Sequence, residues 1–232
     1  MKSILITGAS SGIGRATAEA FLTAGWRVGL IARRLELLEE VAAGQSQAVV
    51  LPADVTDAPA MAQAFAAFGD VDVLFNNAGM FGPSAPIDEI ALDDWAQVLN
   101  VNLNGMFIAA RLAFGAMRNS GRGGRIINNG SISAHTPREG SICYTTTKHA
   151  ITGLTKSLAL DGRPFDITAG QIDIGNAESA IVTDLKAANP GMHTMDVGHA
   201  AQSVLHMAQL PLSANVPFMT VMATKMPYLG RG

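Results

Sequence analysis

Residues Thr7–Gly14 read TGASSGIG, and this stretch decides the fold. It follows a short apolar run, Ser3–Thr7, that predicts a buried strand, and it precedes the alanine-rich segment Arg15–Ala24, which predicts a helix. Glycines at positions 8, 12 and 14 let the backbone turn sharply and approach a pyrophosphate at the helix N-terminus. In this position the turn predicts a dinucleotide-binding unit, and a purely structural turn is the weaker alternative.

Strands and helices alternate along the rest of the chain. Apolar runs predict further strands at Arg27–Ala32, Ala48–Leu51, Val71–Phe75, Arg125–Asn129, Asp166–Gln171 and Pro217–Val221. Helical spacing predicts helices at Leu35–Ala43, from Asp57 or Thr56 as cap to Phe68, at Asp88–Asn119 as one or two helices, at Ile142–Leu160 and at Asp196–Gln209. We therefore expect an α/β fold, a Rossmann-type doubly wound parallel sheet of about seven strands with helices on both faces.

Residues 1–232 contain no linker or repeat and are expected to form a single domain for cofactor binding and catalysis. Residues 176–195 break the alternation and predict a mobile loop or short helices over the site. Pro52 is expected to end the third strand, because proline cannot donate a ladder hydrogen bond.

Composition and charge exclude several classes of protein. The net charge is −3 and there is no long basic run, so no nucleic-acid partner is expected. Cys143 is the only cysteine; it is either a catalytic thiol or a small apolar side chain, and the lack of a cationic neighbour favours the second. A strand begins almost at once and no apolar run reaches the ~18 residues of a membrane span, so we expect a soluble cytoplasmic protein without membrane contact.

The end of the second strand bears on the choice of cofactor. A site for NAD places a carboxylate about 20 residues past the glycines to hold the ribose 2′-hydroxyl. Here Arg33 and Arg34 occupy this region, and no carboxylate follows before Glu36. Because a guanidinium suits a 2′-phosphate, the sequence predicts NADP(H); the alternative is two solvated arginines at a helix start.

Four further motifs follow in order. Asn76–Gly79 read NNAG, Asn102 lies in NVNLNG, Ser131 ends GRIINNGS, and Tyr144 and Lys148 form YTTTK 13 residues after that serine. Together with the glycine-rich turn, over residues 3–225, they resemble the single-domain short-chain dehydrogenase/reductases. The resemblance implies a homodimer or homotetramer formed through the long helices around residues 91–119 and 142–161, and no metal site.

The resemblance also implies the site residues. The catalytic residues would be Asn102, Ser131, Tyr144 and Lys148. The cofactor would be held by Gly8, Ser10, Ser11, Gly12, Ile13, Gly14, Arg33, Arg34, Asp54, Val55, Asn77, Ala78, Gly79, Tyr144, Lys148, Gly175 and Ala177. One departure is Ile174-Gly175 where the family has Pro-Gly after the sixth strand, with Gly175 expected to keep the turn; Ser179 stands where a threonine is frequent.

The chemistry can be argued from the residues themselves. Tyr144 and Lys148 lie four positions apart on a predicted helix and therefore on one face. A nearby ammonium favours the phenolate, so we expect the pKa of Tyr144 to fall by roughly two to three units from its ordinary value near 10. Ser131 would hold the substrate oxygen. These residues predict an oxidoreductase that transfers a hydride between NADP(H) and a small carbonyl or alcohol substrate.

Two other functions are compatible with parts of this pattern. A non-catalytic NADP(H)-binding sensor or scaffold is disfavoured by the intact Ser131, Tyr144 and Lys148, and a sugar-nucleotide epimerase by the chain length and glycine spacing. Between serine and tyrosine, His135, Arg138 and Glu139 stand where pocket walls are expected. His135 is either a second acid–base group or, as the spacing favours, a surface loop residue.

Overall fold

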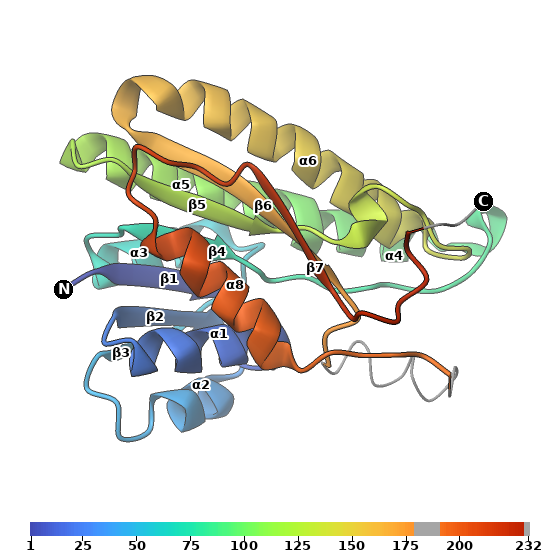
Figure 1. The fold of residues 1–232 in the computed structure, drawn as a ribbon, viewed down its shortest axis with the longest axis horizontal. Coiled ribbons are helices and arrows are strands. Elements are labelled where there is room, and N and C mark those ends of the chain that lie inside the picture. The colour runs from blue at the N-terminus through green and yellow to red at the C-terminus, as the bar shows by residue number, and fades with distance from the viewer. Residues whose placement is uncertain (179–190, 230–232) are drawn as a thin grey trace.

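The computed structural model describes residues 1–178 and 191–229, in which one parallel sheet of seven strands lies between two layers of helices (Figure 1). The strands are β1 (Ser3–Thr7), β2 (Arg27–Ala32), β3 (Ala48–Pro52), β4 (Val73–Asn76), β5 (Gly124–Asn129), β6 (Ile167–Gly175) and β7 (Phe218–Met222). The α-helices are α1 (Gly12–Thr23), α2 (Leu35–Ala42), α3 (Ala58–Phe68), α4 (Leu92–Leu99), α5 (Gly105–Ser120), α6 (Ile142–Gly162) and α8 (Val197–Gln209). Short helical turns are η1 (Ile87–Glu89), η2 (Asn100–Asn104), η3 (Ile132–Ala134) and η4 (Arg163–Phe165).

The strand order is β3-β2-β1-β4-β5-β6-β7, and every neighbouring pair is parallel. The order reverses between β1 and β4, where the chain crosses from one half of the sheet to the other. This confirms the predicted Rossmann-type fold, and the carboxyl ends of the strands beside such a reversal are where ligands bind.

The core has two halves, one on each face of the sheet. On one face α1, α2 and α8 cover the sheet, and Phe21 packs edge-on against Trp26 with ring centroids 5.0 Å apart. On the other face α3, α5 and α6 pack over Leu5, Leu74 and Ile126, which are completely buried (Figure 1). The nearly continuous apolar strands of the sequence are explained by this burial on both faces.

Several predicted boundaries need correction. Pro52 is part of β3, because β3 is an edge strand and a missing N–H costs no ladder bond there. β6 continues four residues past Gln171 to Gly175, since it pairs with β5 on one side and with β7 on the other. β4 begins at Val73 and not at Val71. The segment predicted as helical from Asp88 contains α4, the π-helical turn η2 and α5.

The turn after β6 also differs from the prediction. Asn176, and not Gly175, adopts the left-handed conformation, with φ of 54°. Beyond it Ala177 pairs with Met195 in an isolated parallel bridge. Residues 179–190, with Ser179, lie outside the described residues, so the predicted loop over the site is described only at its two ends.

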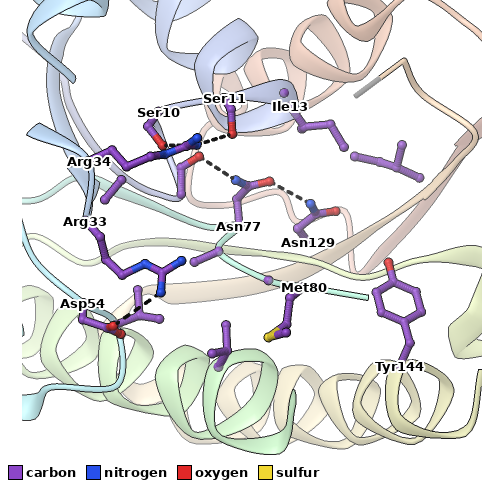
Figure 2. A pocket seen from close by; sticks show the side chains of 18 of the residues that line it. Ser10, Ser11, Ile13, Arg33, Arg34, Asp54, Asn77, Met80, Asn129 and Tyr144 are labelled. Atoms are coloured by element: carbon purple, nitrogen blue, oxygen red, sulfur yellow. Dashed lines mark hydrogen bonds and ion pairs between the residues drawn. The ribbon is translucent and has the colours of Figure 1, made fainter. Parts of the chain in front are cut away.

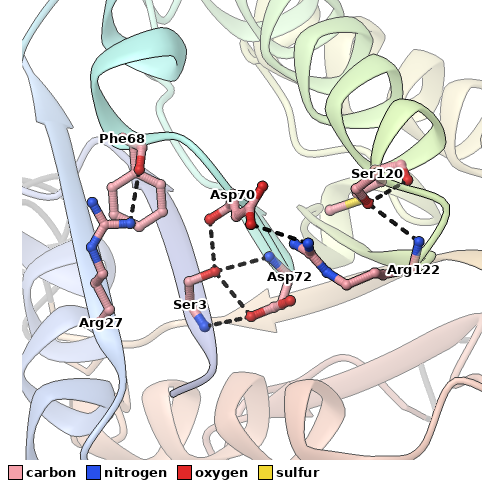
Figure 3. A network of polar contacts seen from close by, with 8 residues as sticks. Ser3, Arg27, Phe68, Asp70, Asp72, Ser120 and Arg122 are labelled. Carbon is pink, nitrogen blue, oxygen red and sulfur yellow. Dashed lines mark hydrogen bonds and ion pairs between the residues drawn. The ribbon is translucent and has the colours of Figure 1, made fainter.

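The amino ends of two central strands are held together by a polar network between the start of β1 and the segment before β4 (Figure 3). Asp72 Oδ2 accepts a hydrogen bond from the backbone N–H of Ser3 at 2.8 Å, and Ser3 Oγ accepts one from the N–H of Asp72 at 3.0 Å. Nearby, Arg122 pairs with Asp70 at 3.1 Å, but both side chains are mostly exposed. Within the described residues no helix is both long and apolar enough to cross a membrane.

We expect Asp72→Ala to lower the free energy of unfolding by about 2 kcal/mol, because the backbone N–H of the buried residue Ser3 loses its acceptor. Asp70→Ala is the matched control, and loss of its exposed ion pair should cost less than about 1 kcal/mol. Urea denaturation of the two variants measures both values. Equal losses would contradict the assignment of the Ser3–Asp72 contact as the stronger one.

Candidate active site

The ends of β1 and β4 are tied together by side-chain hydrogen bonds. Thr7 Oγ1 accepts hydrogen bonds from the backbone N–H groups of Asn77 at 2.9 Å and Ala78 at 3.0 Å. Asn77 Nδ2 donates in return to the carbonyl of Thr7 at 2.9 Å. The glycine-rich turn and the NNAG segment, 70 residues apart, therefore form one rigid rim at the strand reversal.

A cavity of about 380 Å³ opens along this rim (Figure 2). All of the residues predicted to hold the cofactor line it, except Gly14 and Gly175. Ile174, which departs from the family pattern, also lines it, and so do residues that no motif indicated as part of the site: Ala32, Ala53, Met80, Gln97, Val101, Asn129, Gly130 and Asn176. Asn129, Ile174 and Asn176 lie at the ends of β5 and β6. Because ligands bind at the carboxyl ends of the strands in such sheets, these residues could have been predicted to line the cavity.

Both arginines predicted from the second strand lie at one end of the cavity (Figure 2). Arg34 Nη2 donates to Ser10 Oγ and to Ser11 Oγ, each at 3.0 Å. Arg33 lies 4.0 Å from Asp54 Oδ2. Burial raises the pKa of Asp54, but hydrogen bonds from Thr56 and the charge of Arg33 outweigh it, so this pKa lies below its ordinary value. This end of the cavity presents guanidinium groups held by hydroxyl oxygens and a carboxylate.

Asn102 lies in the π-helical turn η2 and is almost completely buried. Its Oδ1 accepts from the N–H of Met80 and its Nδ2 donates to the carbonyl of Met80, both at 2.8 Å. The same Nδ2 donates to Thr147 Oγ1 at 3.2 Å. Asn102 therefore fixes the segment after β4 against the turn of α6 that precedes Lys148.

Lys148 lies inside the protein with 3% of its surface exposed. Its Nζ donates to the carbonyl of Asn129 at 2.7 Å. Burial lowers the pKa of Lys148 to about 8, and the charge of Asp173 opposes this change. Asn129 Nδ2 donates to Asn77 Oδ1 at 2.8 Å, while its own Oδ1 is buried with no hydrogen-bond partner in the part of the chain that the structure describes.

The environment of Tyr144 differs from the prediction. Burial raises the pKa of Tyr144 above its ordinary value; hydrogen bonding with Ser131 and the charge of Arg138 oppose this, and Asp173 adds to it. The expected lowering by Lys148 is wrong for this arrangement. Lys148 Nζ lies 5.3 Å from the ring centroid and donates to the carbonyl of Asn129. Because its pKa is about 8, Lys148 has lost its charge before a phenol with a raised pKa titrates.

Ser131 follows β5 and caps η3. Its Oγ accepts a hydrogen bond from the N–H of Ser133 at 3.1 Å, which leaves the hydroxyl hydrogen available to donate. Its backbone N–H donates to Asp173 Oδ1 at 2.9 Å. Ser131 is buried and does not line the cavity, but it lies within hydrogen-bonding reach of Tyr144, which does.

Three further residues near Ser131 and the start of α6 were considered as site residues from the sequence, and the structure describes each of them. Cys143 is completely buried, and burial raises the pKa of its thiol, which agrees with a small apolar side chain. His135 is 41% exposed and its Nε2 lies 2.8 Å from Asp173 Oδ2. Arg138 Nη2 donates to Asn176 Oδ1 at 3.1 Å. No group of His, Cys, Asp and Glu side chains in residues 1–178 and 191–229 is arranged to hold a metal.

Comparison with known proteins places the chain in a family. Residues 2–190 match the family model described as short chain dehydrogenase. The chain belongs to this family. As a short-chain dehydrogenase it is a member of a family of oxidoreductases that bind a nicotinamide cofactor.

Individual relatives cover almost the whole chain. A serine 3-dehydrogenase of Agrobacterium fabrum is 30% identical over 98% of this short-chain dehydrogenase and 96% of the relative. The closed form of a serine dehydrogenase complexed with NADP⁺ superposes with a TM-score of 0.91, at 23% identity, over 99% of this chain and 98% of that chain. A 3-ketoacyl-(acyl-carrier-protein) reductase of Brucella melitensis complexed with NADH gives 0.86, at 24% identity, over 95% and 96%. At these identities the two structures establish the fold alone.

Because the pKa of Lys148 is lowered in the folded protein, the free energy of unfolding should depend on pH. In the unfolded chain this lysine titrates near 10.4, whereas in the folded chain its pKa is about 8. Between these values the unfolded state binds a proton that the folded state does not, so stability rises with pH. Relative to Lys148→Met, the free energy of unfolding of the wild type should rise by about 1.4 kcal/mol per pH unit from pH 8 to 10.

Urea denaturation of both proteins between about pH 7 and pH 10 measures this difference. The other titrating groups are common to the two proteins and cancel. Stability curves that stay parallel over the whole range would contradict a lowered pKa for Lys148.

Proposed function

We propose that this protein is an NADP(H)-dependent short-chain dehydrogenase/reductase that interconverts a small carbonyl compound and its alcohol, with Tyr144 as the general acid and base. The observation that carries the proposal is the arrangement along one cavity. Arg33 and Arg34 lie at one end, and Tyr144 and Lys148 line the same cavity. An adenosine phosphate and a nicotinamide are the two ends of one molecule, and these two groups of residues suit them.

The glycine-rich turn fits a dinucleotide. A Cβ atom at Gly14 would collide with the carbonyl oxygen of Gly8, and one at Gly8 would lie 2.9 Å from Asn77 Nδ2 and 3.0 Å from Ala78 Cα. Gly8 and Gly12 also have positive φ, so glycine is required by conformation as well as by space. The first turn of α1 faces the cavity, and its unpaired N–H groups favour a pyrophosphate.

A preference for NADP(H) is supported by the charges at the ribose end. Arg34 is held by the hydroxyls of Ser10 and Ser11, and Arg33 lies beside Asp54. The two similar structures contain NADP⁺ in one case and NADH in the other, so they do not distinguish the cofactors. The proposal therefore rests on this chain's own arginines, whose guanidinium groups pair well with a phosphate.

The nicotinamide, when bound, would supply or accept the hydride. The protein's own contribution would be to orient the substrate and move a proton. Ser131, whose Oγ already accepts from Ser133, would donate its hydroxyl hydrogen to the substrate oxygen. Tyr144 would give its phenolic proton to that oxygen during reduction and take it back during oxidation. Lys148 and Asn102 would hold the cofactor side of the site in place through Asn129 and Met80.

The raised pKa of Tyr144 favours one direction at neutral pH. A phenol with a pKa above its ordinary value stays protonated, which is the form that donates during carbonyl reduction. Oxidation of the alcohol needs the phenolate and should therefore require a higher pH. We propose carbonyl reduction as the reaction favoured near neutrality.

We expect Tyr144→Phe to lower kcat for reduction by about 10³-fold while NADPH binding changes by less than about threefold, since only the proton donor is removed. A panel of small aldehydes, ketones and keto acids followed by NADPH absorbance identifies the substrate for this measurement. Phe81, whose ring lies 5.0 Å from that of Tyr144, supplies the control variant Phe81→Leu, which should retain most of the activity. A Tyr144→Phe protein with near wild-type kcat would refute the proposed acid.

A second prediction concerns the cofactor. Arg33→Asp should weaken NADPH binding by about 10- to 100-fold and leave NADH binding within about threefold, because Arg33 would pair with the 2′-phosphate that NADH lacks. Fluorescence titration with each nucleotide measures both constants. Arg122→Asp, whose side chain pairs with Asp70 far from the cavity, is the matched charge-reversal control. An unchanged NADPH/NADH ratio for Arg33→Asp would remove the reason for choosing NADP(H).

A further inference from the structure

Asp173 is a buried carboxylate near the end of β6 that none of the steps proposed above uses. Its side chain is completely inaccessible to solvent. Oδ1 accepts from the N–H of Ser131 at 2.9 Å and from Gln171 Nε2 at 2.7 Å, and Oδ2 lies 2.8 Å from His135 Nε2. Burying a carboxylate costs free energy unless it is hydrogen-bonded, and these three contacts offset that cost for Asp173.

These contacts reach both ends of the turn η3. Ser131 is the residue before η3 and His135 the residue after it, so one carboxylate fixes both ends of the turn that begins at the proposed substrate-binding hydroxyl. The chain passes so close to Asp173 that a Cβ atom at Gly130 would collide with Oδ1. The position of Ser131 therefore depends on a contact from a different strand.

The same carboxylate lies within the electrostatic environment of Tyr144. Among the described residues, the charges that act on the phenol are those of Arg138 before α6 and Asp173 on β6. Lys148 on α6 lies 5.3 Å from the centroid of the ring, and His135 after η3 contacts Asp173. The segment after β4 contributes the apolar ring of Phe81. Asp173 raises the pKa of Tyr144 and also that of Lys148, so it opposes loss of either proton.

We propose that Asp173 and His135 are positioning residues that fix both ends of η3, and with them Ser131 beside Tyr144. The charge of Asp173 adds to this by opposing loss of the Tyr144 proton. The part that concerns turnover rests on the proposed function. The part that concerns the charge is a property of the folded chain.

The charge is tested by ¹³C NMR with tyrosine labelled at Cζ. The chain has two tyrosines, Tyr144 and Tyr228, so Tyr144→Phe assigns the two signals. Asp173→Asn keeps an acceptor for the N–H of Ser131 but removes the negative charge, and the Tyr144 titration should move to lower pH. Asp161→Asn at the exposed end of α6 is the control and should not shift it. An unshifted Tyr144 signal in folded Asp173→Asn overturns the electrostatic role.

The positioning role is tested at His135, which is partly exposed and whose variants should fold even where Asp173→Asn does not. His135→Ala should lower kcat about tenfold with the KM for NADPH within about twofold, because Ser131 is less well placed. His135→Gln, whose amide nitrogen can donate to the same carboxylate oxygen, should restore most of the loss. His199→Gln on α8 is the control. Wild-type kcat in His135→Ala, or no recovery in His135→Gln, overturns the positioning role.

The dependence of the reduction rate on pH tests both roles in one measurement. In Asp173→Asn, the fall of the reduction rate with rising pH should shift to lower pH by the amount seen in the NMR titration, whereas His135→Gln should leave it in place. A wild-type protein that reduces no carbonyl of the panel would refute the proposed function. The NMR titration of Tyr144 would still decide whether Asp173 controls its proton.

Discussion

The side chain of Thr7 at the end of β1 accepts hydrogen bonds from two backbone N–H groups of the segment after β4, and the other parts of the site depend on this contact. Asn77 answers by donating to the carbonyl of Thr7 and by accepting from Asn129 at the end of β5. Asn129 in turn accepts from Lys148. A chain of hydrogen bonds thus runs from the glycine-rich turn across three strand ends to α6, and a small shift at the strand reversal would be transmitted to the proposed catalytic lysine.

At the α6 end of this series of hydrogen bonds, two titratable side chains are buried within each other's electrostatic field. Lys148 is almost inaccessible and Asp173 completely so, yet both lie close to Tyr144. Burial alone would favour the neutral lysine and the neutral phenol. Asp173 raises the pKa of both groups, which opposes the effect of burial on Lys148 and adds to the effect of burial on Tyr144. The outcome is a phenol that stays protonated beside a lysine that loses its proton more readily than usual.

Much of this could be predicted from local patterns. The run Thr7–Gly14 between a strand and a helix fixes the first βαβ unit, because glycine at these positions is a requirement of backbone space and conformation. Alternating strands and helices predict a parallel sheet, and helical spacing places Tyr144 and Lys148 on one face of α6. The two arginines that follow β2 in place of a carboxylate, Arg33 and Arg34, do line the cavity.

Other features were decided only by the tertiary structure. β6 extends to Gly175 because β5 and β7 pair with it on both sides, and the left-handed turn falls on Asn176. The prediction that the pKa of Tyr144 is lowered was wrong, because burial raises this pKa and Lys148 donates to the carbonyl of Asn129 on β5. The sequence by itself determined which elements form and which side chains carry reactive groups. Burial and long-range hydrogen bonds, which depend on how distant segments pack, decided how those groups are charged and held.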